Sequence, residues 1–70
     1  MADTPASTDR TWRYRFALPD GTEIETGEHP GDDAAEARAR ELSVAQVTAV
    51  TVERHNRVDW EYVTEVDERP

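Results

Sequence analysis

The sequence predicts an α+β domain with the element order β-β-α-β-β. Four antiparallel strands, ordered 2-1-3-4, are expected to carry one helix on one face. Two observations carry this prediction. Residues 11–18 alternate apolar and polar side chains, and a period of two is typical of a strand with one buried face. Residues 58–64 repeat the pattern, and an alanine-rich stretch with helical spacing lies between the two runs.

The first two strands are predicted to form a hairpin around the Leu-Pro-Asp-Gly sequence at residues 18–21. Proline presets its φ angle, aspartate can bind the local backbone, and glycine accepts a left-handed conformation. A loop of three residues then places Phe16 opposite Ile24 on the buried face. The same register pairs Arg15 with Glu25 on the other face, where opposite charges stabilise the hairpin.

The helix is predicted to follow the loop at residues 27–31 and to end near Ser43. Asp33 and Glu36 have the spacing of a capping box, with Asp33 or Asp32 as the cap. The predicted apolar stripe consists of Ala35, Ala39 and Leu42. Because these side chains are mostly small, the helix can approach a sheet closely, and we expect it to cover the core.

The last two strands are predicted over residues 46–53 and 58–65. In this interpretation the short loop between them puts Asn56 in the left-handed conformation that asparagine tolerates. Val52 then lies opposite Val58 on the buried face. The whole pattern predicts a core made of Trp12, Tyr14, Phe16, Leu18, Ile24, Ala35, Ala39, Leu42, Val44, Val50, Val52, Val58, Trp60 and Tyr62.

Residues 10–66 are predicted to form a single domain, since a chain of 70 residues has room for only one. Residues 1–9 are small, polar and acidic without periodicity, and we expect a disordered tail there. Residues 67–70 are expected to fray. A core this small leaves a thin margin of stability, which favours a partner chain or a bound ligand.

The charge balance is strongly acidic, with 16 carboxylate residues against 8 arginines and no lysine. Codon usage in a GC-rich genome and adaptation to high salt both explain this composition. Under either explanation, a net charge of −8 disfavours attraction of the whole molecule to nucleic acid or to an anionic membrane.

The sequence contains no convincing catalytic or metal-binding motif. It has no cysteine, and hence no disulfide and no thiolate zinc site. His29 and His55 are expected in loops without metal-ligand spacing, and a helix cap accounts for Asp32 and Asp33. No apolar run has the length of a membrane span. We therefore expect a cytoplasmic protein that is not an enzyme and has no cofactor.

The sheet face opposite the helix is the predicted interaction surface. Its predicted members are Ala17, Val47, Ala49, Thr51 and Val63, with Arg13 and Arg15 beside them. A small apolar centre with a charged rim is typical of a protein–protein contact. The first hypothesis is thus a non-catalytic interaction module that uses this face or an edge strand, bound to a protein partner or to itself as a homodimer.

Two alternatives remain open. The acidity suggests a decoy that imitates nucleic acid and binds a basic protein. Direct binding of RNA or DNA through Arg13, Arg15 and the aromatic residues is the third hypothesis. Net charge and the predicted burial of the aromatic side chains both disfavour it.

Overall fold

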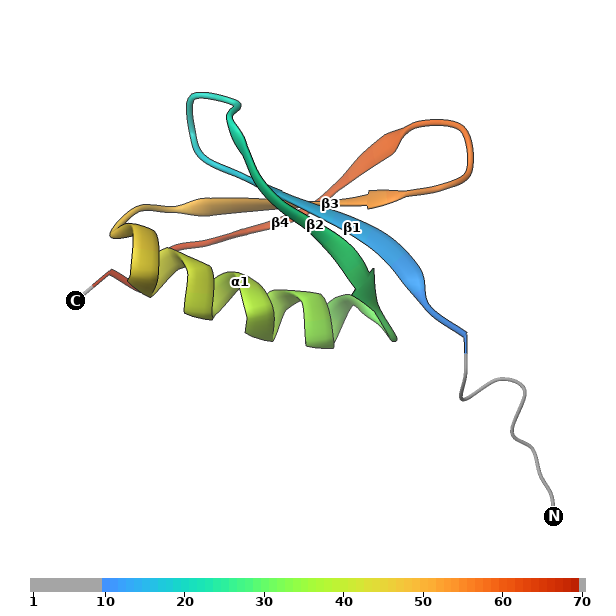
Figure 1. Ribbon diagram of the computed structural model, residues 1–70, viewed down its shortest axis with the longest axis horizontal. Helices are drawn as coiled ribbons and strands as arrows, with labels where there is room; N and C mark the ends of the chain where they lie inside the picture. Colours follow the sequence, from blue (N-terminus) through green and yellow to red (C-terminus); the bar gives the residue numbers. More distant parts are fainter. Residues whose placement is uncertain (1–9, 70) are drawn as a thin grey trace, which may run out of the picture.

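The computed structural model describes residues 10–69 as one sheet and one helix (Figure 1). The elements, in chain order, are β1 (Trp12–Ala17), β2 (Glu23–His29), α1 (Asp32–Gln46), β3 (Val50–His55) and β4 (Trp60–Val66). All neighbouring strands are antiparallel, and their order is β2-β1-β3-β4. The predicted fold class and strand order are confirmed. The predicted tail at residues 1–9 lies outside the described residues.

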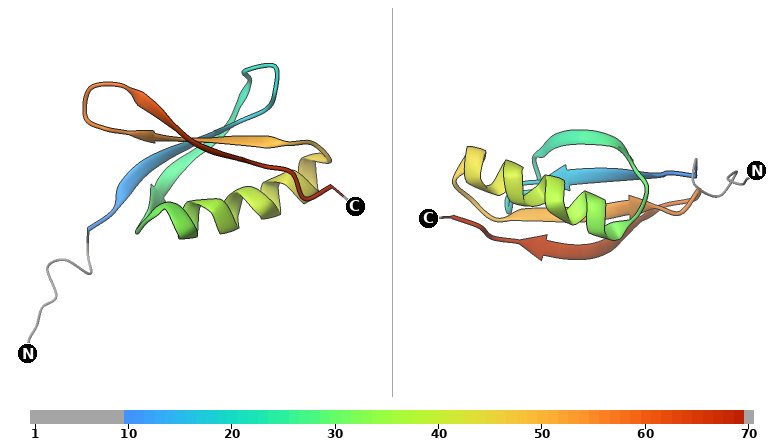
Figure 2. Two further views of the ribbon diagram at one scale, coloured as in Figure 1. Left: turned by 180° about the vertical axis from the view of Figure 1, so that it is seen from behind. Right: turned by 90° about the horizontal axis from the view of Figure 1, so that it is seen from below.

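Helix α1 lies across one face of the sheet and leaves the opposite face uncovered by the described residues (Figure 2). The buried face is built on Tyr14 and Phe16 of β1 and on Val50 and Val52 of β3, all with 0% exposure. From the helix and the last strand, the core takes Ala35, Ala39, Leu42 and Val66. Alanines at the contact bring the helix backbone close to these strands, as the sequence predicts.

The first hairpin has the predicted turn but a different register. The Leu18 N–H donates to the carbonyl of Thr22 at 2.8 Å. A bulge next to Phe16 then shifts the pairing by one residue, so that Phe16 lies opposite Glu25 rather than Ile24. The shift puts Glu25 on the helix side, where Arg38 of α1 binds both its oxygens at 2.6 and 2.8 Å. This ion pair between strand and helix stabilises the bulged register.

The helix is longer than predicted at both ends. It begins at Asp32 after Gly31, whose position carries no side-chain cap, so the predicted capping box is wrong. It continues to Gln46, and Val47 ends it in the left-handed conformation with φ 55°. Ser43 closes this end by donating from its hydroxyl to the Thr48 carbonyl at 2.6 Å.

The second hairpin differs most from the prediction. Strand β3 starts only at Val50 and extends through His55, and a four-residue loop over residues 56–59 leads to β4. Val52 therefore lies opposite Thr64 rather than Val58. The Asn56 side-chain oxygen accepts the N–H groups of the third and fourth loop residues, which holds the longer loop closed.

This register moves aromatic residues out of the core. A bulge after Val52 puts Tyr62 opposite Glu53, on the face away from the helix, and His55 opposite Trp60 on the same face. The exposed residues of the predicted core are Trp12 (39%), Val44 (53%), Val58 (87%) and Tyr62 (68%). Leu18, Ile24 and Trp60 are half-buried. Val66, which the prediction omits, replaces them in the core at 5% exposure.

Candidate interaction face

The uncovered side of the sheet, here called the open face, is defined by strand pairing. Side chains that alternate with the core residues of β1 and β3, and the partners of these residues on β4, project from it. Its members on these three strands are Arg13, Arg15, Ala17, Thr51, Glu53, His55, Trp60, Tyr62 and Glu65. Both signs of charge and two large aromatic side chains thus share one surface.

Four of the seven predicted interface residues come together on this face. Ala17 and Thr51 lie directly opposite each other on β1 and β3. Arg13 and Arg15 project from the same side of β1 and approach glutamates on the neighbouring strands. The arginines are therefore paired across strands, but Arg15 pairs with Glu53 of β3 rather than with the predicted Glu25, which the bulge turns toward Arg38.

The other three predicted residues lie elsewhere. Val47 is 63% exposed at the end of α1, and Ala49 is 9% exposed in the segment before β3. Val63 packs partly against the core. The predicted placement of these three residues fails for two reasons. The helix extends through residue 46, and a bulge between β3 and β4 changes which side chains of β4 face the helix. The predicted patch of small apolar side chains therefore does not form.

Trp60 is fixed on the open face by contacts on two sides. The guanidinium carbon of Arg15 lies 4.5 Å from the centroid of its ring, within the range of a cation–π interaction. His55 meets the same indole edge-on, with ring centroids 5.0 Å apart. Arg15 also donates from Nε to Glu53 at 2.7 Å. The indole is thus held in place while part of its surface stays accessible.

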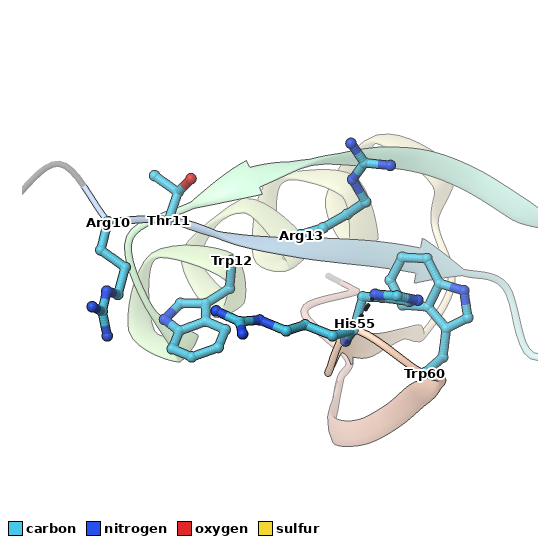
Figure 3. A pocket seen from close by; sticks show the side chains of 7 residues that line it. Arg10, Thr11, Trp12, Arg13, His55 and Trp60 are labelled. Atoms are coloured by element: carbon cyan, nitrogen blue, oxygen red, sulfur yellow. Dashed lines mark hydrogen bonds between the residues drawn. The ribbon is translucent and has the colours of Figure 1, made fainter.

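A hollow of about 370 Å³ opens at the end of the face where β1 and the β3–β4 hairpin diverge (Figure 3). Strand β1 pairs with β2 from Trp12 onward, whereas its pairing with β3 reaches only to Tyr14. The residues that line the hollow are Arg10, Thr11, Trp12, Arg13, His55, Arg57 and Trp60. We call this hollow the arginine–tryptophan pocket.

The arginine–tryptophan pocket is a basic site on an acidic protein. Among residues 10–69, three of its lining residues are arginines and none is a carboxylate, although the chain carries a net charge of −8. Arg13 has Glu28 at 3.9 Å, with both side chains more than half exposed. Arg10 and Arg57 form no ion pair within residues 10–69. A guanidinium group without an ionic partner among these residues can bind an anionic ligand.

Trp12, which forms one wall of the pocket, contacts a polar network on the helix side of the sheet. The Arg54 guanidinium lies 5.7 Å from the Trp12 ring centroid and 3.0 Å from Asp32. The Tyr14 hydroxyl donates to the same carboxylate at 2.6 Å. Burial, together with the hydrogen bond and the charge of Asp32, raises the pKa of Tyr14 to about 12. These contacts join the pocket wall to the start of α1.

A second hollow, of about 320 Å³, lies at the other end of the open face beside the β1–β2 loop. Arg15, Glu23 and Glu53 contribute both signs of charge to its lining, so it has no clear preference for a charged ligand. Strands β1 and β3 connect the two hollows. The open face therefore carries two depressions with the Arg15–Trp60 contact between them.

The histidines lie in strands rather than in the predicted loops. His29 ends β2 and meets the rings of Tyr14 and Phe16 edge-on at 5.8 and 5.6 Å. His55 ends β3 and accepts the Arg57 N–H at 3.1 Å. Within residues 10–69, no group of three or more His, Asp or Glu side chains is placed to hold a metal ion. No helix of this part of the chain is long and apolar enough to cross a membrane.

Comparison with known proteins gives no relative: no protein-family model matches the chain, and no match is found among curated proteins or solved structures. The functional argument therefore depends on the geometry of the open face.

Sequence reasoning missed the pocket because it placed Trp60 in the core. One local signal points to the correct register. Asparagine and aspartate at residues 56 and 59 favour a four-residue loop whose backbone they can bind. Such a loop puts His55 opposite Trp60 and turns the indole outward.

Proposed function

We propose that the chain is a non-catalytic protein–protein interaction module that binds through the open face. The observation that carries this proposal is the exposure of Tyr62, at 68%, beside the half-buried Trp60 on a face that no described segment covers. Tyrosine, tryptophan and arginine are the residues that contribute most often to binding energy at interfaces. The partner is another protein or a second copy of the chain. The homodimer and the cytoplasmic location remain predictions.

Binding through the face is better supported than pairing through an edge strand. The edge strand β2 presents exposed carboxylates at Glu23 and Glu28, and the edge strand β4 presents them at Glu61 and Glu65. Charged side chains on an edge disfavour the addition of another strand. The centre of the open face has no such barrier, because Arg15 and Glu53 neutralise each other there.

The acidic-decoy alternative has less support. A mimic of nucleic acid needs carboxylates that are free to meet a basic partner. Arg38 binds Glu25, Arg15 binds Glu53, and the Asp32 carboxylate is shared by Arg54 and Tyr14. These internal contacts occupy three of the 16 carboxylates of the chain, and these three are not free to meet a basic partner.

Site-specific photo-crosslinking tests the proposal. A photoreactive phenylalanine analogue replaces Tyr62 in one variant and Val44 in the other, and both proteins are irradiated in the source cells. Val44 is the matched control because it is 53% exposed on α1, on the opposite side of the molecule. We expect adducts from position 62 with one discrete protein or with a second copy, and none from position 44.

Equal adducts from both positions, or adducts from position 44 alone, would contradict binding through the open face. If neither position gives adducts, the result would contradict the interaction module as a whole. Light scattering of the wild-type chain at low and molar salt then separates self-association from binding to another protein. Self-association that persists at molar salt identifies an apolar contact, whereas self-association that is lost there identifies an electrostatic one.

A further inference from the structure

We infer that the arginine–tryptophan pocket binds an extended acidic segment of a partner protein. A carboxylate of that segment binds the guanidinium groups of Arg10 and Arg57, and an adjoining apolar side chain lies against the indoles of Trp12 and Trp60. This inference rests on the proposed function, because it specifies the chemistry of the partner. Two groups of observations support it: the charge of the pocket and the divergence of the strands around it.

The charge of the pocket selects an anion. Arginine binds carboxylates through parallel N–H donors, and a bond to a charged acceptor is stronger than one to a neutral acceptor. Arg10 and Arg57 come from two separate segments of the chain that line the hollow, one before β1 and the other in the β3–β4 loop. In Figure 3 Arg10 lies beside Trp12, whereas Arg13 extends away from the indoles. Arg13 also has Glu28 nearby, whereas Arg10 and Arg57 have no ionic partner within residues 10–69, so we assign the anion to these two groups.

The divergence of the strands favours an extended backbone. At Trp12 and Arg13 the side of β1 that faces β3 has no strand partner among residues 10–69, because that pairing ends at Tyr14. An extended peptide that enters the hollow can pair with this stretch of backbone. Strand addition provides main-chain hydrogen bonds, while pockets beside the strand select alternate side chains.

An acidic peptide suits the surroundings of the pocket better than a polynucleotide does. A nucleic acid carries a charge at every phosphate and extends beyond the hollow, where Glu53 and Glu65 project from the same face. A peptide can confine its carboxylates to the pocket. The net charge of −8 adds repulsion that grows with the number of charges on the ligand.

The chain provides its own reporter for this test, since its two tryptophans are the two that line the pocket. The probe is an acetylated, amidated hexapeptide of alternating aspartate and leucine, titrated into the full-length chain while tryptophan emission is recorded. The control probe replaces aspartate with asparagine. We expect a saturable change with the aspartate peptide, a Kd at least about tenfold weaker with the asparagine peptide, and weaker binding as salt rises.

Two single-charge variants assign the binding to the pocket. Arg57→Gln removes a guanidinium from an exposed loop, and we expect it to raise the Kd about tenfold. Arg40→Gln is the matched control: it removes the same charge from the exposed side of α1, where Arg40 lies 3.7 Å from Glu36. We expect a change of less than about twofold. Arg10→Gln should behave like Arg57→Gln.

Equal effects of the Arg57 and Arg40 variants, or equal binding of the two peptides, would overturn the inference. Tighter binding of a single-stranded twelve-nucleotide oligothymidine than of the peptide would assign the pocket to nucleic acid instead. Loss of peptide binding alongside intact crosslinking from position 62 would reject this inference alone. Loss of crosslinking with intact peptide binding would reject the open-face proposal.

Discussion

The guanidinium carbon of Arg15 on β1 lies 4.5 Å from the ring centroid of Trp60 on β4, although strand β3 separates their backbones. Glu53 of β3 lies directly opposite Arg15 and accepts its Nε–H at 2.7 Å. A single arginine side chain therefore connects three of the four strands on the open face. This contact holds the aromatic centre of the open face in one orientation.

The Arg15–Glu53 pair is predicted to stabilise the fold, whereas the Arg13–Glu28 pair is not. Both pairs join residues directly opposite on neighbouring strands of the same face. The first has side chains 30% and 26% exposed, and the second 61% and 57%. Double-mutant cycles with glutamine at each position should give a coupling free energy of about 1 kcal/mol for the first pair and close to zero for the second. Equal couplings would contradict this account.

Tyr14 is predicted to make the protein sensitive to alkaline pH. The raised pKa of about 12 means that the native chain keeps the tyrosine proton above pH 10, the ordinary pKa, where the unfolded chain loses it. The unfolded state then binds fewer protons, so the free energy of unfolding falls between pH 10 and 12 and is unaffected by this group below that range. The loss should reach about 3 kcal/mol at most.

Urea unfolding at several pH values measures this loss, and Tyr14→Phe should remove the slope between pH 10 and 12. The chain has two tyrosines, so Tyr62→Phe leaves Tyr14 as the only one, and phenolate absorbance then reports its titration directly. A midpoint at pH 10 in the native protein would show that burial and the hydrogen bond to Asp32 do not hold the proton.

The substitution Ala49→Asn is predicted to destabilise the fold strongly, and Tyr62→Asn only weakly. Ala49 is 9% exposed, so a larger polar side chain there must displace packed neighbours and loses its contact with water, at a cost of about 3 kcal/mol. Tyr62 is 68% exposed, and its replacement should cost less than about 1 kcal/mol. Thermal unfolding of the two variants measures both costs. The registers predicted from the sequence give the opposite result, because they bury Tyr62 and expose Ala49.

That reversal shows where sequence reasoning succeeds and where it stops. The alternation around Tyr14 and Phe16 identifies a strand with one buried face, and the small residues Ala35 and Ala39 identify the helix that covers it. Element types and their order then limit the sheet to few topologies. Alternation and element order can be read from neighbouring residues, and they are sufficient to predict the fold class.

Registers depend on individual side-chain contacts, both distant and local, in addition to the alternation of apolar residues. The bulge that turns Glu25 toward the helix is stabilised by Arg38, which lies 13 residues away. The longer second hairpin depends on the Asn56 side chain binding the loop backbone. Periodicity contains neither contact, and one residue of slip transfers every later side chain to the other face. The arginine–tryptophan pocket was missed for this reason.

Glycine at either of two strained positions is predicted to stabilise the protein. Val47 has φ 55° and Arg57 has φ 83°, a region that side chains with a β-carbon disfavour. Replacement by glycine removes this cost at the expense of some chain entropy, so each variant should gain about 0.5 kcal/mol. Chemical denaturation measures the gain. Only Arg57→Gly should also weaken binding of the acidic peptide.

The converse substitution at Gly21 is the control for this argument. Gly21 has φ 94° and nothing lies within 4 Å of the position a β-carbon would occupy. Gly21→Ala therefore introduces the unfavourable conformation without a steric clash and should cost about 1 kcal/mol. A neutral effect at Gly21 would show that positive φ is not costly in this chain, and the predicted gains would not be expected.

Ser43→Ala is predicted to destabilise the fold and to release the carboxyl-terminal segment. The Ser43 side chain has 0% exposure, and its hydroxyl donates to the Thr48 carbonyl at 2.6 Å while accepting the Glu68 N–H at 2.8 Å. Alanine leaves both backbone groups without this partner, at a cost of about 1–3 kcal/mol. Hydrogen exchange should then speed up at the Glu68 amide more than at amides in the centre of β3.

Val44→Ala is the matched control, because it shortens a side chain of the same helical turn that is 53% exposed and outside the core. Its free energy of unfolding should change by less than about 0.5 kcal/mol, and Glu68 exchange should stay at the wild-type rate. If Ser43→Ala speeds exchange equally along the whole chain, the serine contributes to global stability alone. Selective exchange at Glu68 would instead show that one buried hydroxyl joins the end of α1 to the segment that follows β4.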